Sequence, residues 1–184
     1  MVSTDHELIE QSKMGNMGAF EQLIFRYDKD VLTLASRYTQ SSDDAKDIYQ
    51  EVFFRAYKGL KNFQARSEFS TWLYRITTNV CLTYHAREKK RAEIPLYDSD
   101  SDLSCDPVGS ETSDAGIHGN EISERIQKAL TILSPQQKIV FTLRHFHEYK
   151  LKDIAVVMDC AEGTVKKYLF EAMQKMRTQL KDLY

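Results

Sequence analysis

The stretch DDAKDIYQEVFFRAYKG, residues 43–59, predicts an amphipathic helix whose polar face is unusual. Apolar residues at helical spacing form one buried stripe: Ala45, Ile48, Tyr49, Val52, Phe53 and Ala56. On the opposite face Asp47, Glu51 and Phe54 are spaced i, i+4 and i+7, so an aromatic ring lies in line with two carboxylates. This face is either an ordinary solvated acidic surface or a docking surface for a basic partner, with Phe54 as its anchor. Periodicity alone leaves both interpretations open.

Apolar residues recur at helical spacing along most of the 184-residue chain, and this pattern predicts an all-α protein. The chain has only seven glycines and three prolines, and strand-like alternation is almost absent. No apolar run approaches the roughly 20 residues needed to cross a bilayer, and the first residues lack the apolar stretch of a signal peptide. We therefore expect a cytoplasmic protein with no direct membrane insertion.

The spacing of cysteines and histidines argues against a metal site. Cys81, Cys105 and Cys160 form no CxxC pair, which is typical of small apolar residues in a reducing compartment. Cys81 and His85 could share one helix turn, but the sequence near them supplies no third ligand. The chain also lacks a nucleophile and base pair, a carboxylate dyad and a phosphate-binding glycine loop. We expect no metal, no cofactor and no catalytic residue, and hence a protein that is not an enzyme.

The formal net charge of −2 is unevenly distributed along the chain. Residues 92–119 contain seven acidic residues and no lysine or arginine, and they include two prolines, three glycines and many serines. This composition predicts a flexible acidic linker that cannot bury enough surface to fold alone. We expect two small helical domains, at residues 1–91 and 120–184, joined by this linker.

Capping signals predict the helix boundaries of the first domain. Helices are expected over residues 5–13 and from residue 17 to about residue 40. The sequence SSDD at 41–44 is expected to cap the helix of the opening stretch, and Gly59 to end it. Ser70 is expected to cap the last helix of the domain.

That last helix carries polar residues on the face away from its apolar stripe: Arg75, Thr78, Asn79 and Thr83. It is preceded by a loop with Asn62, Phe63, Gln64 and Arg66, and it ends in the basic residues Arg87, Lys89, Lys90 and Arg91. The basic end alone is explained as well by the helix dipole and by solubility. The combination supplies charge for phosphates, donors for base edges and rings for stacking, which is what single-stranded nucleic acid requires.

The second domain has the pattern of a helix-turn-helix. Ser134 and Pro135 are expected to start one helix as its N-cap and first residue. A short helix at residues 154–158 then leads through the tight turn DCAEG into a helix from Thr164, with Val165, Leu169 and Met173 facing inward. The second helix also carries basic residues, namely Lys166, Lys167, Lys175 and Arg177. A DNA-reading helix and a generic helical hairpin both fit this pattern, and the basic residues favour DNA.

With both domains laid out, the chain resembles the extracytoplasmic-function (group IV) sigma factors of bacterial RNA polymerase. Five motifs match the order of that family's regions 2.1, 2.2, 2.3 to 2.4, 4.1 and 4.2: AFEQLIFRYDKDVLTLASRY, DAKDIYQEVFFRAYKGLKNFQ, FSTWLYRITTNVCLTYHAREKKR, LSPQQKIVFTLRHFHEYKLKDIA and GTVKKYLFEAMQKMRTQL. The resemblance implies a subunit that binds core polymerase and directs promoter-specific transcription initiation, as in a stress response. It implies three partners, which are core RNA polymerase, promoter DNA and an anti-sigma factor.

The resemblance also implies a role for each candidate surface. Residues implied to bind the clamp of the largest polymerase subunit are Asp44, Asp47, Gln50, Glu51 and Phe54. Residues implied to capture the non-template strand of the minus-10 element are Asn62, Phe63, Arg66, Arg75, Asn79 and Arg87. Residues implied to read the minus-35 duplex are Thr164, Lys166, Lys167 and Lys175. The acidic linker is implied to thread the RNA exit path of the polymerase.

The helix-turn-helix departs from the family pattern at two places. Asp159 stands where a glycine is usual, and aspartate tolerates the left-handed conformation that the turn requires. The sequence KKYLFEAMQKM replaces an arginine-rich run, which leaves fewer phosphate contacts. Two alternatives therefore stay open: a helix-turn-helix regulator that acts without binding core polymerase, and an interaction protein that keeps sigma-like helices without promoter activity.

Overall fold

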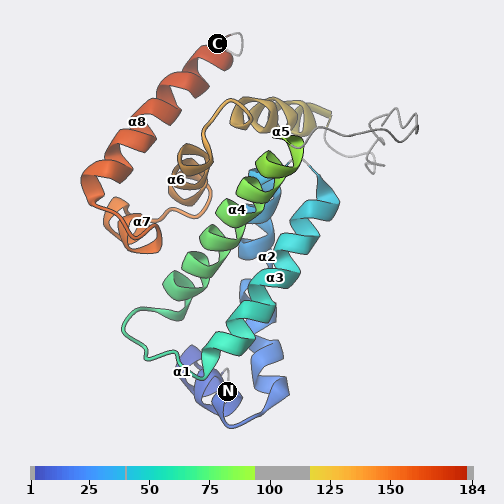
Figure 1. Cartoon of the computed structure of the whole chain (residues 1–184), viewed down its shortest axis with the longest axis vertical. Coiled ribbons are helices and arrows are strands. Elements are labelled where there is room, and N and C mark those ends of the chain that lie inside the picture. Colours follow the sequence, from blue (N-terminus) through green and yellow to red (C-terminus); the bar gives the residue numbers. More distant parts are fainter. Residues whose placement is uncertain (1–2, 40, 94–116, 182–184) are drawn as a thin grey trace.

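The computed structural model describes residues 3–39, 41–93 and 117–181, and within these ranges the regular structure is helical (Figure 1). The helices are α1 (Asp5–Lys13), α2 (Met17–Tyr38), α3 (Ser42–Leu60), α4 (Phe69–Glu93), α5 (Ile117–Leu130), α6 (Pro135–His145), α7 (Leu151–Val157) and α8 (Glu162–Gln179). The expectation of an all-α protein is confirmed. The expected flexible linker falls mostly on residues 94–116, outside the described ranges.

Helices α1–α4 form an N-terminal unit, and the first three of them begin at side-chain caps. Thr4 starts α1 with a capping box, and Asn16 starts α2 by accepting a hydrogen bond from the amide of Ala19. Ser41 caps α3 as expected, because its side chain accepts from the amide of Asp44.

Two expected boundaries of this unit are wrong. Gly59 does not end α3, which continues to Leu60. The glycine instead makes room for Trp72, whose ring lies 3.1 Å from where a Cβ at Gly59 would stand. Ser70 lies inside the first turn of α4 rather than at its N-cap. The carbonyl of Glu68 already accepts from the amide of Trp72 at 3.2 Å, so the helical hydrogen bonding begins earlier than expected.

Helices α5–α8 form a C-terminal unit, and the turn between α7 and α8 is a helix-turn-helix turn. Asp159 has φ +52°, the left-handed conformation expected for it. The amide of Cys160 donates to the carbonyl of Ala155 at 3.0 Å and that of Asp159 to Val156 at 3.3 Å, which is a Schellman ending of α7. Ser134 and Pro135 start α6 as expected, with a capping box.

The inward face of α8 differs from the expectation at one residue. Val165 is buried and Leu169 is half-buried, but Met173 is exposed. Ala172 and Met176 face the interior in its place. Together with Leu130 and Phe141 they form a small core among α5, α6 and α8.

The two units are packed against each other, which the sequence analysis does not anticipate. Helix α6 lies against α2, and α7 lies against α4 (Figure 1). One hydrophobic cluster runs through both units and joins Leu34 and Cys81 to Ile139 and Leu143. The N-terminal bundle and the helix-turn-helix therefore share a core.

Candidate binding surfaces

The face of α3 that combines acids with Phe54 is open to solvent. Asp47 and Gln50 are exposed, and the Phe54 side chain is 53 % exposed. The ammonium group of Lys58 lies 3.9 Å from the centre of the Phe54 ring and holds one side of it by a cation–π contact. An apolar ring of this size on a charged face is a ready anchor for a partner.

The acidic surface continues from α3 onto α4. Asp44 and Glu51 are half-buried, and Glu51 accepts a 2.6 Å hydrogen bond from Arg55 one turn later. Burial, and then the carboxylate of Asp44 beside its hydroxyl, raises the pKa of Tyr84 on α4. A cavity of about 320 Å³ lies between the two helices and is lined by Asp47, Ile48, Glu51, Arg55, Val80, Thr83, Tyr84, Arg87 and Glu88. The structure thus brings Arg87 beside the acidic face.

The loop between α3 and α4 exposes Asn62 and Arg66 but buries Phe63. Phe63 is only 7 % exposed, because its ring packs edge-on against Phe69 at 5.9 Å and tilted against Trp72 at 4.9 Å. The ring offers no free face on which a base could stack. We therefore remove Phe63 from the set of candidate DNA contacts and assign it the role of holding the loop on α4.

The polar face of α4 is divided between solvent and the C-terminal unit. Asn79 and Arg87 are exposed, and Thr83 donates to the carbonyl of Asn79 at 2.7 Å. Thr78, expected on the same face, is 1 % exposed. Arg75 forms an ion pair with Asp159 of the α7–α8 turn, at 3.0 Å. The docked helix-turn-helix accordingly lies at the edge of the surface expected to capture single-stranded DNA.

The basic residues expected to read duplex DNA lie at two levels along α8, Lys166 and Lys167 in its first turns and Lys175 two turns later. Lys166 and Lys167 are exposed near its start and form ion pairs within the helix, with Glu162 at 2.8 Å and with Glu171 at 4.0 Å. Thr164, in the first turn, is half-buried. Pairs of this kind on an exposed helix are weak, so the lysines can exchange them for phosphates.

Lys175, unlike Lys166 and Lys167, is hydrogen-bonded to a residue of another helix, Gln137 of α6. Its ammonium group donates to Gln137 Oε1 at 3.0 Å, and Gln137 Nε2 donates to Glu171 at 2.7 Å. These hydrogen bonds link α6 to α8. Lys175 is therefore less available to a phosphate than Lys166 and Lys167.

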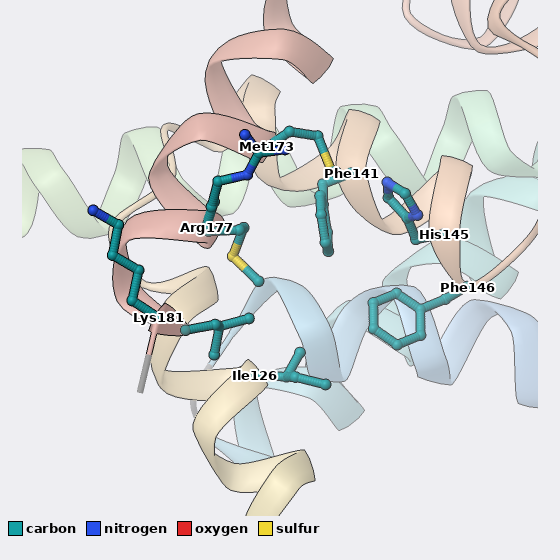
Figure 2. Close-up of a pocket in the computed structure, with 9 residues that line it drawn as sticks. Ile126, Phe141, His145, Phe146, Met173, Arg177 and Lys181 are labelled. Carbon is teal, nitrogen blue, oxygen red and sulfur yellow. The ribbon is translucent and has the colours of Figure 1, made fainter. Parts of the chain in front are cut away.

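The C-terminal unit also has a groove that the sequence did not lead us to expect. It has a volume of about 500 Å³ and lies among α5, α6 and α8 (Figure 2). Its apolar lining consists of Ile126, Phe141, Phe146, Met173, Met176 and Leu180, and its polar rim of His145, Arg177 and Lys181. The helical spacing of Met173 and Met176 on α8 and of Leu180 at its C-cap is the signal that could have revealed it.

Comparisons with known proteins identify the family. The sigma-70 region 2 model matches residues 23–91, and a sigma-70 region 4 model matches residues 123–176. The chain is 30 % identical to the RNA polymerase sigma-H factor of Pseudomonas aeruginosa, over 97 % of this chain and 95 % of that protein. It is also 30 % identical to the ECF RNA polymerase sigma-E factor of Escherichia coli K12, over 98 % and 96 % of the two chains.

Two solved structures share the fold over most of the chain. CnrH in complex with the cytosolic domain of CnrY has a TM-score of 0.70 at 22 % identity, over 98 % of this chain and 99 % of that one. The sigma factor RpoE of Bartonella quintana in complex with the anti-sigma factor NepR has a TM-score of 0.65 at 22 % identity, over 88 % and 96 %. The chain belongs to the extracytoplasmic-function sigma factors of the sigma-70 family, which bind core RNA polymerase and direct transcription from particular promoters. None of the helices that the structure describes is long and apolar enough to cross a membrane.

Proposed function

We propose that this sigma factor divides its work among three surfaces. The acidic face of α3 with Phe54 binds the clamp of core polymerase. The loop with Asn62 and Arg66, together with Arg75, Asn79 and Arg87 of α4, captures the minus-10 strand. The first turns of α8, with Thr164, Lys166 and Lys167, contact the minus-35 duplex.

The single observation that carries this proposal is the exposure of Phe54. A phenylalanine that is 53 % exposed beside Asp47 and Glu51 is not part of the core, which Val52 and Phe53 of the same helix fill. Buried on a partner, the same ring becomes a binding anchor that can contribute 2 kcal/mol or more, roughly, while the acids select a basic surface. The alternative, a helix-turn-helix regulator that does not bind core polymerase, does not explain why an acidic face carries an exposed phenylalanine.

The exposed polar groups of the loop and α4 support strand capture. Asn62, Arg66 and Asn79 present amide and guanidinium donors to solvent within one unit. The exposed lysines at the start of α8 support a separate contact with duplex phosphates.

We further propose that the protein acts in the cytoplasm, without catalysis of its own, and that an anti-sigma factor regulates it. The support for a regulator is the shared fold with CnrH, solved with CnrY, and with RpoE, solved with NepR. A docking segment from such a regulator and core polymerase would compete for the same sigma factor.

Run-off transcription with purified core polymerase tests the main proposal. The double change Asp47→Ala with Phe54→Ala is expected to abolish core binding and transcription while helicity and thermal melting stay nearly unchanged. A matched control is Glu21→Ala with Phe25→Ala, because this pair also joins an exposed acid to an exposed phenylalanine, on α2. The proposal is wrong if both double variants lose the same amount of polymerase affinity in a pull-down titration.

A further inference from the structure

The groove of Figure 2 belongs to none of the three proposed binding surfaces. Its floor is formed by Phe141 of α6 and Met176 of α8, which are 8 % and 4 % exposed and belong to the small core of the C-terminal unit. Ile126, Phe146 and Leu180 pack against that core and also line the groove. An apolar hollow of about 500 Å³ lies within the range of small-molecule sites, roughly 300–1,000 Å³.

The aromatic wall of the groove is held in place by contacts of its own. The Phe146 ring meets the Phe141 ring edge-on at 6.3 Å, and the guanidinium of Arg37 lies 4.3 Å from the centre of the Phe146 ring. The Phe141 ring also packs against the ring of His145, at 4.5 Å. Side chains fixed by such contacts lose little conformational entropy when a ligand binds, so the groove is preorganised.

The charged groups at the groove are positive. Arg177 lies in the last turn of α8, and Lys181 comes directly after its C-cap, Leu180. Both side chains are exposed, neither forms an ion pair within the part of the chain that the structure describes, and no acidic residue lines the groove. His145 is neutral near pH 7, because burial and then the charge of Arg144 lower its pKa. The groove therefore offers two unpaired cations to an anion.

The shape of the groove favours a compact ligand over a long partner helix. Met173, Arg177 and Lys181 also line a second, smaller hollow of about 310 Å³, so these side chains form a rim between the two hollows. Figure 2 shows Phe146 and His145 across the groove from this rim. The groove is thus bounded on both sides. A short apolar chain with an anionic end fits between the two sides, with its charge at the rim.

We propose that the groove binds a monomeric long-chain fatty acid. The acyl chain lies against Phe141, Phe146 and Met176, where burial of its methylene groups is favourable in proportion to the area removed from water. The carboxylate lies at Arg177 and Lys181, where its hydrogen bonds are charge-assisted. Nucleotides and sugars do not fit, because the floor supplies no hydrogen-bond donor for their polar atoms. This site goes beyond the proposed function, which does not depend on it.

Titration of the full chain with dodecanoate, kept below its critical micelle concentration, tests the site. Binding is read by NMR of isotope-labelled methionine methyl groups. Met173 and Met176 line the groove, whereas Met14 and Met17 are exposed on the N-terminal unit and report non-specific binding. Saturable shifts of Met173 and Met176 alone are expected. Equal shifts at Met14 and Met17, or no shift in the groove, would overturn the proposal.

The head group and the chain of the ligand are tested separately. Arg177→Gln with Lys181→Gln is expected to weaken dodecanoate binding at least about tenfold. The matched control, Lys150→Gln with Lys152→Gln, removes two exposed cations elsewhere in the same unit and should leave the affinity unchanged. Octanoate should bind at least about tenfold more weakly than dodecanoate, because fewer methylene groups are buried. Equal affinities for the two double variants, or for the two chain lengths, would overturn the proposal.

Two other occupants of the groove are outcomes of the same experiment. Binding to phosphatidylglycerol vesicles without any response to monomeric dodecanoate would identify a membrane surface and overturn the proposal. Shifts of Met173 and Met176 on addition of core polymerase, again without a response to dodecanoate, would identify a protein surface and overturn it as well. Run-off transcription without fatty acid tests the proposed function independently, so failure of one proposal is distinguishable from failure of the other.

Discussion

Helices α3 and α4 are neighbours, and each has a buried apolar stripe and a polar outer face. The two outer faces differ in how far they are exposed to solvent. The face of α3 is open, with Phe54 held only by Lys58 of its own helix. The face of α4 is partly covered, with Arg75 paired to Asp159 and Thr78 buried. The surface proposed to bind polymerase is thus exposed in the structure, whereas the surface proposed to capture DNA is partly covered by the C-terminal unit. If these proposed roles hold, polymerase can bind without any rearrangement of α3.

The largest expected effect is on the free energy of unfolding, and it distinguishes Phe63 from Phe54, which the sequence alone presents as two exposed aromatic residues. Phe63→Ala is expected to destabilise the fold by about 3 kcal/mol or more, because it removes a ring buried between Phe69 and Trp72. Phe54→Ala is expected to change the free energy of unfolding by less than about 0.5 kcal/mol, since its ring faces solvent. Chemical denaturation of both variants measures the difference. A large loss of stability in Phe54→Ala would mean that the α3 face is structural.

The next prediction separates the two DNA surfaces on one promoter. Asn79→Ala is expected to slow strand opening and to leave protection of the upstream duplex intact, at a cost of roughly 1–3 kcal/mol per lost base contact. Lys166→Ala with Lys167→Ala is expected to weaken the closed complex and to flatten its salt dependence by about one unit of slope per lost phosphate contact. Footprinting beside a probe of strand opening checks both. Loss of the upstream footprint in Asn79→Ala would contradict the division.

A pH dependence is expected from the contact between α4 and the α6–α7 loop. Burial lowers the pKa of His147 below its ordinary value, although Asp30 opposes the shift, and its other neighbours Tyr74 and Tyr149 stay neutral near pH 7. The arrangement in which the two units pack together therefore binds fewer protons than one in which His147 is exposed to solvent. Docking is complete above the ordinary histidine value of about 6.5 and weakens as the pH falls through it. Small-angle scattering should show a larger radius of gyration at pH 5.5 than at pH 7.5, and His147→Gln should remove that difference.

The smallest effect concerns Asp159, whose charge and backbone can be tested apart. Asp159→Asn keeps a residue that tolerates positive φ and removes the ion pair with Arg75, which is largely exposed. It should change stability by about 0–1 kcal/mol. Asp159→Ala should cost about 1 kcal/mol more, because alanine is strained in the left-handed region. Equal melting temperatures for the two variants would show that the turn does not constrain this residue.

The sequence predicts most of what is local in this protein. Helical spacing located the helices, and Ser41, Ser134 and Asp159 have the capping or left-handed conformations expected from their chemistry. Phe54 is exposed because it lies off the apolar stripe of α3, and that stripe can be counted along the sequence.

What the sequence does not reveal depends on contacts between distant residues. Phe63 looks like an exposed loop aromatic, and only its packing with Trp72 shows that it is buried. Thr78 and Arg75 look like free polar residues because nothing near them in sequence shows that α7 covers α4. Docking of two helical units has no periodic signal, since it uses side chains that are compatible with solvent exposure as well.

The ion pair between Arg75 and Asp159 has a consequence for how the protein searches the genome. Non-specific DNA binding comes almost entirely from cations that reach phosphates, and a bacterial genome offers about a million or more such sites. While Arg75 is paired with Asp159, one cation of the proposed strand-capture face is engaged within the chain. Non-specific DNA must displace this pair to gain that phosphate contact, so the pair lowers non-specific binding slightly without preventing it.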